Sequence, residues 1–145
     1  MDHNDYLTQN PEAYDTWKAT LQSSAVTIPI DTEHIIARHV VWAGREFAAG
    51  DESGELFLLP GWVGNPPQMD AARRDIEALV RDCLANFQTV IAKSDSLLCA
   101  RPCGGQIGLS DFGNSLDTVH FAIDTIRMST WWDWQNAVVT TAYPT

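Results

Sequence analysis

The residues of this chain that could carry metal chemistry are few, and their spacing predicts no shared site. Four histidines occur, and two of them, His34 and His39, are five residues apart. On a strand this spacing places them on opposite faces, so they would be poor joint ligands. A metal site would need His120 together with one of them and a carboxylate such as Asp117 or Asp124. We therefore expect ordinary surface or strand histidines, with no metal and no other cofactor.

The sequence contains equally little evidence for nucleophilic or acid–base catalysis. The chain has no Gly-x-Ser-x-Gly motif, which would place a serine nucleophile on a sharp turn. Asp111 with Asp117, and Asp124 with Asp133, are carboxylate pairs that could serve as acid and base, but no neighbouring residue indicates a raised pKa. The Gly104–Gly105 pair is too short and too poorly placed for a phosphate-binding loop. We predict that the chain is not an enzyme and has no catalytic residue.

The cysteines are Cys83, Cys99 and Cys103. An odd number of cysteines without an export signal indicates a reducing compartment, so a disulfide framework is not expected. Cys99 and Cys103 form a Cys-x3-Cys pair, which supplies only two of the four ligands that a structural zinc ion takes. Buried or partly buried free thiols are the prediction that fits best.

Tryptophans are the most unusual feature of the sequence. Trp131, Trp132 and Trp134 crowd four positions near the end of the chain. On a strand, Trp132 and Trp134 would share one face while Trp131 pointed the other way. Two interpretations remain open: these side chains fill a core within one subunit, or they are covered by another chain. Tyr14 and Trp17, on a predicted helix, form a second aromatic stripe that would dock onto the sheet or a neighbouring subunit.

Composition describes a folded protein with an acidic surface. The chain has 145 residues, of which 45% are hydrophobic and 19% charged, which predicts one domain over residues 1–145. The formal net charge is -10, and such a field repels phosphate backbones, so specific nucleic-acid binding is not expected. No apolar run is long enough to span a membrane, and the first thirty residues lack the basic start and apolar core of a signal peptide.

The first half of the chain is expected to contain one helix and then strands. Asn10, Pro11 and Glu12 predict the start of a helix that runs to about Gln22. Residues 26–30 resemble a short edge strand. Residues 33–47 and 55–63 are rich in strand-favouring residues, and the glycines and carboxylates of residues 48–54 predict a turn between them. The pattern therefore predicts a long β-hairpin with an acidic tip.

The second half begins with the clearest element of the sequence. From about Pro67 to Lys93, apolar residues recur every three or four positions, which predicts a long amphipathic helix whose apolar stripe could cover a sheet. Strands are predicted over residues 96–101, 106–109, 116–128 and 131–140, with glycine-containing turns at residues 102–105 and 111–114. The fold class is therefore α+β: a mostly antiparallel sheet with a long β-hairpin, packed against one long amphipathic helix and a shorter N-terminal helix.

This order of elements resembles the tail terminator proteins and the other small tail and neck proteins of long-tailed bacteriophages. The residues that carry the resemblance are Glu55 to Pro60, which run into the helix that begins near Pro67, and the strand from Phe121 to Met128. The resemblance covers most of the chain as a pattern, and the tryptophan cluster is not part of it.

The resemblance implies a structural virion protein that is assembled in the cytoplasm of a host bacterium. Such a protein self-associates into a ring, typically of six copies, that joins the tail tube to neighbouring tail or neck proteins. On this interpretation Asp51, Glu52 and Glu55 would face a lumen or the tube, since an acidic lumen lets DNA pass. The residues expected between subunits are Trp131, Trp132, Trp134, Tyr14 and Trp17.

A protein of another class fits the composition equally well. An acidic cytoplasmic immunity protein or inhibitor would bind a basic toxin through complementary charge and aromatic anchors. It would work as a monomer or dimer with its basic partner, whereas a tail protein self-associates. A third alternative, an α+β enzyme or carrier with a small-ligand pocket, would need a cavity lined by Trp and Tyr.

Overall fold

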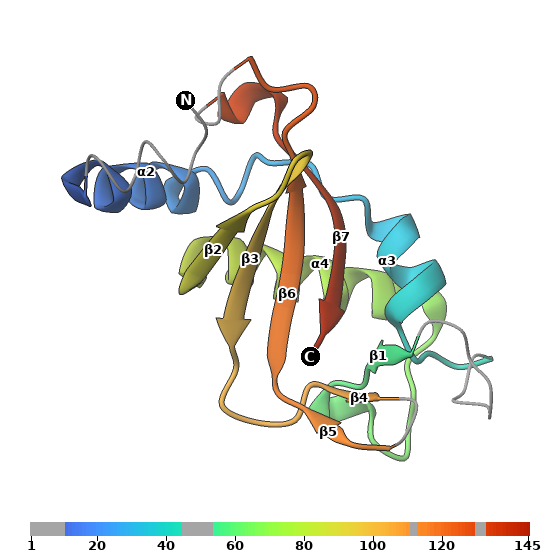
Figure 1. Cartoon of the computed structure of the whole chain (residues 1–145). Coiled ribbons are helices and arrows are strands. Elements are labelled where there is room, and N and C mark those ends of the chain that lie inside the picture. Colours follow the sequence, from blue (N-terminus) through green and yellow to red (C-terminus); the bar gives the residue numbers. More distant parts are fainter. Residues whose placement is uncertain (1–10, 45–53, 111–112, 130–132) are drawn as a thin grey trace.

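The computed structural model describes residues 11–44, 54–110, 113–129 and 133–145 (Figure 1). These residues form an α+β fold, as the sequence predicts. The described helices are α2 (Pro11–Ser23), α3 (Thr32–His39) and α4 (Met69–Asn86), with short 3-10 turns at Pro60–Trp62 and Trp134–Asn136. No helix within the described ranges is long and apolar enough to cross a membrane.

The larger sheet has four antiparallel strands in the order β2-β3-β6-β7. Their bounds are Thr89–Ala92 (β2), Ser96–Pro102 (β3), Thr118–Asp124 (β6) and Val138–Pro144 (β7). Buried and half-buried side chains alternate along β6, so Val119, Phe121 and Ile123 lie on one face of the sheet and their neighbours on the other. One face is therefore part of the core and the other is not.

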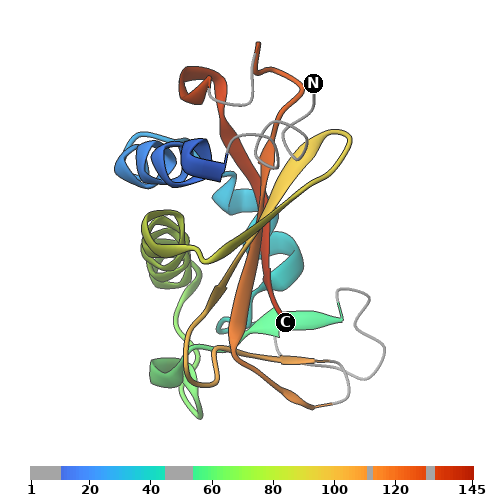
Figure 2. The same ribbon diagram turned by 60° about the vertical axis from the view of Figure 1, so that its left-hand side comes forward.

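Helix α4 covers the buried face of this sheet, and α2 lies beside α4 on the same side (Figure 2). The buried residues of α4 are Ala72, Ile76, Val80, Cys83 and Leu84, which follow the spacing of three and four that the sequence shows. The prediction that this helix covers a sheet is confirmed. Helix α3 flanks the outer edge of β7 and also packs against α4 (Figure 1).

A smaller antiparallel sheet lies at one end of the larger one, with the order β1-β4-β5. Its strands are Glu55–Phe57, Gly108–Ser110 and Ser115–Leu116. A Cβ atom at Gly108 would lie 2.6 Å from Pro144 Cγ and 2.7 Å from the carbonyl oxygen of Leu56. Only glycine therefore lets β4 approach both β1 and the end of β7 this closely.

The predicted hairpin of residues 33–47 and 55–63 is wrong. Residues 32–39 form helix α3, and β1 pairs with β4 instead of with a preceding strand. The Asp31 side chain caps α3 by accepting a hydrogen bond from the His34 backbone N–H, and Arg38 and His39 lie near the negative end of the helix dipole. These end signals outweigh the strand preference of Ile35 and its neighbours. The expected hairpin tip, with Asp51 and Glu52, lies outside the described residues.

Residues 26–30 do not form the predicted edge strand. They turn between α2 and α3, and a single parallel bridge joins Ile30 to Val139 of β7. The Arg81 side chain of α4 stabilises the turn, because its Nη1 donates to the carbonyl oxygens of Ala25 at 2.9 Å and Ile28 at 3.0 Å. A tertiary contact therefore satisfies backbone groups that a strand would have paired.

The long helix ends earlier than predicted, at Asn86 instead of about Lys93. Phe87 is extended, and Thr89–Ala92 is strand β2, in which β-branched residues favour a sheet. Side chains of α2 bind the chain at this junction: Gln22 donates to the Phe87 carbonyl oxygen and Lys18 to that of Gln88.

The strands of the last third are confirmed in part. The strand predicted for residues 96–101 is β3, while the long run of residues 116–128 divides into β5, β6 and a turn. Gly104 and Gly113, from the two predicted turns, both have a positive φ (76° and 79°) that glycine adopts readily, whereas residues 111 and 112 lie outside the described residues. In the final segment, Trp134 lies in a 3-10 turn and the strand begins at Val138, so the predicted strand from residue 131 starts too early.

Candidate functional site

The face of the larger sheet that points away from α4 is covered by no helix or strand of the described chain (Figures 1 and 2). We call it the open face. Strand partners opposite one another share a face, so the register defines its members. They are Thr89 and Ile91 of β2, Ser96, Leu98, Ala100 and Pro102 of β3, Thr118, His120, Ala122 and Asp124 of β6, and Val138, Thr141 and Tyr143 of β7.

The middle of the open face is apolar. Leu98, Ala100 and Ala122 are only half-buried there, in contrast to the fully buried positions that alternate with them. Ile91 is 53% exposed on the same face, and Ile126, just beyond the end of β6, is 75% exposed. Exposed apolar side chains grouped on one face in this way commonly mark a contact with another molecule.

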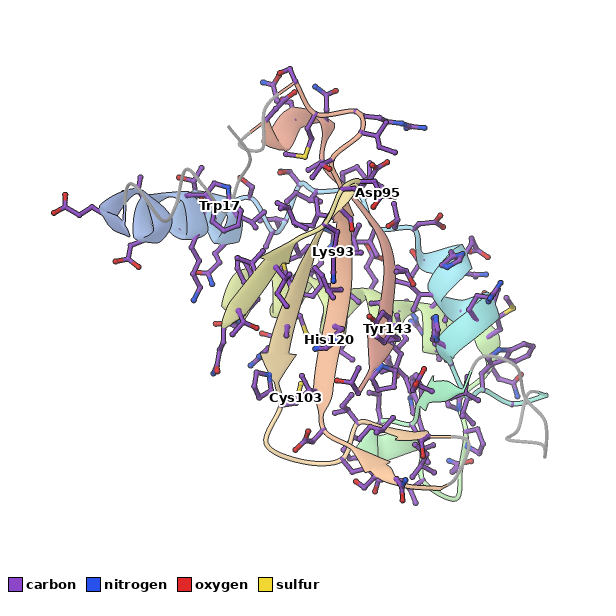
Figure 3. All side chains as sticks on the ribbon, in the orientation of Figure 1. Trp17, Lys93, Asp95, Cys103, His120 and Tyr143 are labelled. Carbon is purple, nitrogen blue, oxygen red and sulfur yellow. The ribbon has the colours of Figure 1, made fainter. Side chains whose placement is uncertain are left out.

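One end of the open face holds a histidine–tyrosine cluster, formed by His39, His120 and Tyr143. The Tyr143 ring lies between the two histidines, with centroid distances of 5.7 Å to each; the His120 ring meets it edge-on (Figure 3). His39 Nδ1 lies 3.1 Å from the backbone carbonyl oxygen of Glu55. Residues from α3, β6 and β7 therefore meet here, although they are far apart in the sequence.

The pKa shifts of His120 and Tyr143 favour the uncharged forms of these two side chains at neutral pH. Burial lowers the pKa of His120 below its ordinary value of 6.5. Burial, and then the negative charge of Glu55, raises the pKa of Tyr143 above its ordinary value of 10. Both shifts move these groups away from titration at neutral pH, which suits a packing surface better than a proton-transfer site.

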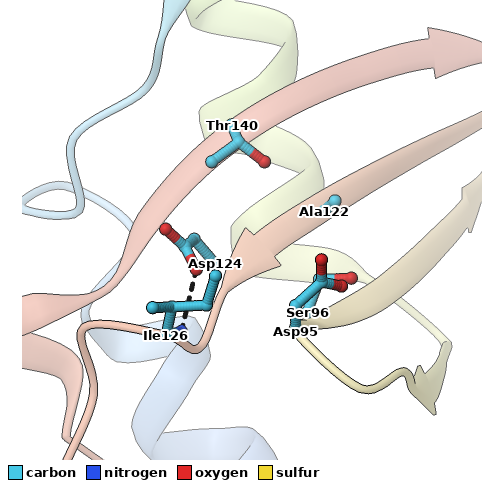
Figure 4. A pocket seen from close by; sticks show the side chains of 6 residues that line it. All are labelled: Asp95, Ser96, Ala122, Asp124, Ile126 and Thr140. Atoms are coloured by element: carbon cyan, nitrogen blue, oxygen red, sulfur yellow. Dashed lines mark hydrogen bonds between the residues drawn. The ribbon is translucent and has the colours of Figure 1, made fainter.

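The other end of the open face is hollowed into a pocket of about 270 Å³ (Figure 4). It is lined by Asp95, Ser96, Ala122, Asp124, Ile126 and Thr140. The register between β6 and β7 shifts at Ala122 and Ile123, so Thr140 is an extra residue on β7 at this place. The hollow thus lies beside the irregularity in the ladder.

This pocket presents hydrogen-bond acceptors. Asp124 Oδ1 accepts a bond from the Ile126 backbone N–H at 2.8 Å, which orients the carboxylate, and Ser96 and Thr140, which carry hydroxyl groups, line the same pocket. The arginine ion pairs found among the described residues involve Glu33, Asp70, Glu77 and Asp82, not the pocket carboxylates. The pocket therefore suits donor groups of another molecule, such as an ammonium, guanidinium or amide.

The described residues contain no group of three histidine, cysteine or carboxylate side chains that could hold a metal ion. His34 and His39 lie on helix α3, not on a strand as predicted. His39 and His120 approach the same region, but the Tyr143 ring lies between them. The three cysteines are free thiols.

The structure describes only some of the residues predicted to bind partners. Trp17 is 4% exposed and packs on Phe87, with 6.3 Å between ring centroids, so its ring contacts the protein's own core. Glu55 begins β1 beside the histidine–tyrosine cluster. Trp131, Trp132, Asp51 and Glu52 lie outside the described residues, as do the side chains of Tyr14 and Trp134.

Sequence reasoning missed the open face as a site. Residues 96–102 and 118–124 were predicted as strands, whose side chains alternate between two faces, but this alternation does not tell which face stays uncovered.

Comparison of the chain with models of protein families, with curated proteins and with solved structures finds no match.

Proposed function

We propose that this chain is a structural protein that acts by binding other protein chains over its open face, beginning with further copies of itself. The observation that carries the proposal is the uncovered sheet face, which has apolar residues at its centre and polar groups at both ends. The resemblance to tail terminators gives the proposed form of the assembly: a ring, of about six copies, at the junction of a phage tail and neck. The hairpin that formed part of that resemblance is replaced by α3 among the described residues.

Association would stabilise the open face in two ways. Burying its apolar side chains removes them from water, which contributes about 25 cal/mol for each Å² of apolar surface. Strand β2 is the last strand at one edge of the sheet, so its outer backbone groups can pair with a strand of another chain. A head-to-tail contact of this kind closes into a ring when the rotations between neighbouring copies sum to a full turn.

The net charge of -10 predicts how this assembly responds to salt. Copies that carry the same charge repel one another at low ionic strength. Salt screens this repulsion, because the Debye screening length falls to about 10 Å at 0.1 M. Self-association is therefore expected to strengthen as salt rises. Association with a basic partner would weaken under the same change.

The proposal is tested by native mass spectrometry of the purified protein over a range of concentrations, with four single variants. Ile91→Asp and Ile126→Asp place a charge on or beside the open face. Val63→Asp and Val26→Asp are their controls, because Val63 (61% exposed) and Val26 (78%) match Ile91 (53%) and Ile126 (75%) in exposure but lie away from the sheet.

We expect the wild-type protein and both controls to form a discrete oligomer. Both open-face variants should need a protein concentration about tenfold higher, or more, to form it, and a tenfold change corresponds to about 1.4 kcal/mol of association free energy. A wild-type protein that stays monomeric at all concentrations and salt levels contradicts self-association. Equal behaviour of the open-face and control variants would show that another surface makes the contact.

A second function is favoured by the pocket on the open face. Asp95 and Asp124 offer charged acceptors without an ion pair among the described residues, which suits a basic protein partner such as a toxin bound by an immunity protein. The two functions differ in assembly. A monomer that binds a basic protein, and loses that binding with Asp124→Asn, would favour the inhibitor over the ring protein.

A further inference from the structure

The outer face of α4 lies on the opposite side of the molecule from the open face. Figure 2 shows the sheet between them, with no other element of the described chain outside α4 in this view. Ala71, Arg74 and Ala78 follow the helical spacing of three and four, so they share this outer face. The buried residues of α4, such as Ile76, face the sheet instead. Small side chains therefore flank one long cationic side chain on the outer face, where Arg74 and Ala78 are exposed.

Arg74 differs from the other arginines of α4 in having no carboxylate partner among the described residues. Arg73 pairs with Glu33 of α3, and Arg81 pairs with Glu77 one turn earlier on α4. Within the described ranges, Arg74 makes neither an ion pair nor a hydrogen bond. Its guanidinium is therefore available to a carboxylate of another molecule.

The pocket at one end of the open face offers the complementary charge. Asp124 uses Oδ1 to accept the Ile126 backbone N–H, and its Oδ2 has no partner among the described residues. The Asp95 side chain lines the same pocket and is also without a described partner (Figure 4). Pockets for whole small molecules usually measure about 300 to 1,000 Å³. A volume of about 270 Å³ suits a single inserted side chain better.

The positions of the unpaired cations show which side of a second copy complements this pocket. Lys93 and Arg127 lie within two residues of the pocket lining, so they belong to the side that holds the pocket. Arg38 lies on α3, which flanks the edge of the sheet at β7. The other described lysines and arginines, apart from Arg74, already have partners. Arg74 is thus the unpaired cation that the helical side presents.

We propose that the open face of one copy binds the outer face of α4 of the next copy, with Arg74 of that helix inserted into the pocket lined by Asp95 and Asp124. This inference rests on the proposed self-association and names the second surface of the contact. The alanines of α4 let the helix approach the apolar centre of the open face closely. The sheet then has a helix on each face, a common layered arrangement.

The two surfaces lie on opposite sides of one molecule, so the contact is head-to-tail, as a ring requires. It also supplies a local attraction between copies that each carry a net charge of -10. Charge pairs removed from solvent are screened less than exposed ones. Such pairs fix the register of a contact and disfavour wrong partners. The ion pair therefore selects this surface of the neighbouring copy over its other acidic surfaces.

The test is native mass spectrometry of single variants and of their mixtures at one salt concentration. Arg74→Glu should need a protein concentration at least about tenfold higher than the wild type to form the oligomer, because two carboxylates would then meet a third negative charge. Arg38→Glu is the matched control, since Arg38 is also exposed and unpaired in the described chain. It makes the same charge change and should assemble like the wild type.

Charge reversal on the pocket side provides the decisive mixture. Asp124→Arg should also lose assembly alone, although it lowers the net negative charge. An equimolar mixture of Arg74→Glu and Asp124→Arg should regain it, with the two variants in equal numbers, because every contact then pairs opposite charges. Asp15→Arg makes the same charge change on an exposed position of α2 and should not restore Arg74→Glu.

Circular dichroism checks that each variant is folded, and Asp95→Arg replaces Asp124→Arg if the latter is not, because Asp95 is exposed in the turn before β3. A wild-type protein that stays monomeric overturns both the proposed function and this inference. An oligomer that Arg74→Glu weakens no more than Arg38→Glu, or that the mixture fails to restore, overturns this inference alone.

Discussion

The two faces of the four-stranded sheet come from the same alternating strands but have opposite surroundings. On the covered face, Val119, Phe121 and Ile123 are 0% exposed beneath α4. On the open face, the residues between them, such as His120 and Ala122, are only half-buried. Sequence alternation creates both faces, and the position of the helices decides which one becomes the core.

The covered face contributes mainly to the stability of the fold, whereas the open face is the proposed binding surface. The covered face contains aromatic packing that continues from the sheet to the helices, from Phe121 through Phe87 to Trp17. The open face contains polar groups at both ends of an apolar centre, an arrangement that contributes less to folding but offers a surface to partners. Substitutions on the two faces should therefore have different consequences.

The largest effect is expected on the covered face. Phe121→Ala removes a ring that packs edge-on against Phe87 with 6.1 Å between centroids, and the cavity should lower the free energy of unfolding by about 3 to 5 kcal/mol. Leu98→Ala, on the open face of the adjacent strand, should cost roughly 1 kcal/mol, because Leu98 is only half-buried. Urea unfolding measures both, and equal losses would contradict the distinction between the faces.

An intermediate effect is expected where the smaller sheet meets the end of β7. Gly108→Ala places a methyl group 2.6 Å from Pro144 and should lower the free energy of unfolding by about 1 to 3 kcal/mol through overpacking.

Gly105→Ala is the matched control for Gly108→Ala. A Cβ atom at Gly105 meets nothing within 4 Å, and its φ is not in the left-handed region. The control should be neutral or slightly stabilising, since alanine restricts the unfolded chain. Thermal unfolding distinguishes the two variants, and a stable Gly108→Ala would show that β4 and β7 can move apart at little cost.

The smallest effect is expected from the titration of the open face. Burial lowers the pKa of His120, so the folded protein binds its proton less readily than the unfolded chain does. The stability that this shift contributes is complete above pH 6.5, and it declines as pH falls through 6.5 toward the lowered pKa. Below both pKa values the loss is complete.

His120→Gln should reduce the fall in stability between pH 7.5 and pH 5 in urea unfolding. His34→Gln is the control, because His34 is exposed on α3 and away from the open face. The effect should be much smaller than that of Phe121→Ala, since His120 is only partly buried. An unchanged pH dependence in His120→Gln would show that another group titrates in this range.

Local signals in the sequence predicted those elements whose stabilisation is also local. The Asn10-Pro11-Glu12 start predicted α2, the apolar repeat predicted most of α4, and glycine-containing turns were expected where Gly104 and Gly113 lie. The α+β class followed from their order. The strand preference of residues 33–39 was wrong, because they belong to the capped helix α3 (Thr32–His39), which packs against β7 and α4.

The site, in contrast, depended on contacts between distant residues. Tyr143 lies between His39 and His120 only because β7 pairs with β6 and α3 flanks β7.

The sequence by itself determined the α+β class, the acidic charge, the amphipathic helix and the alternation of the strands, since each depends on residue type and short-range spacing. Only the tertiary structure decided that one sheet face stays open and that Tyr143 meets His39 and His120. The physical reason is that burial is a property of the whole fold: a strand specifies two faces, but the packing of distant helices determines which of them is removed from water.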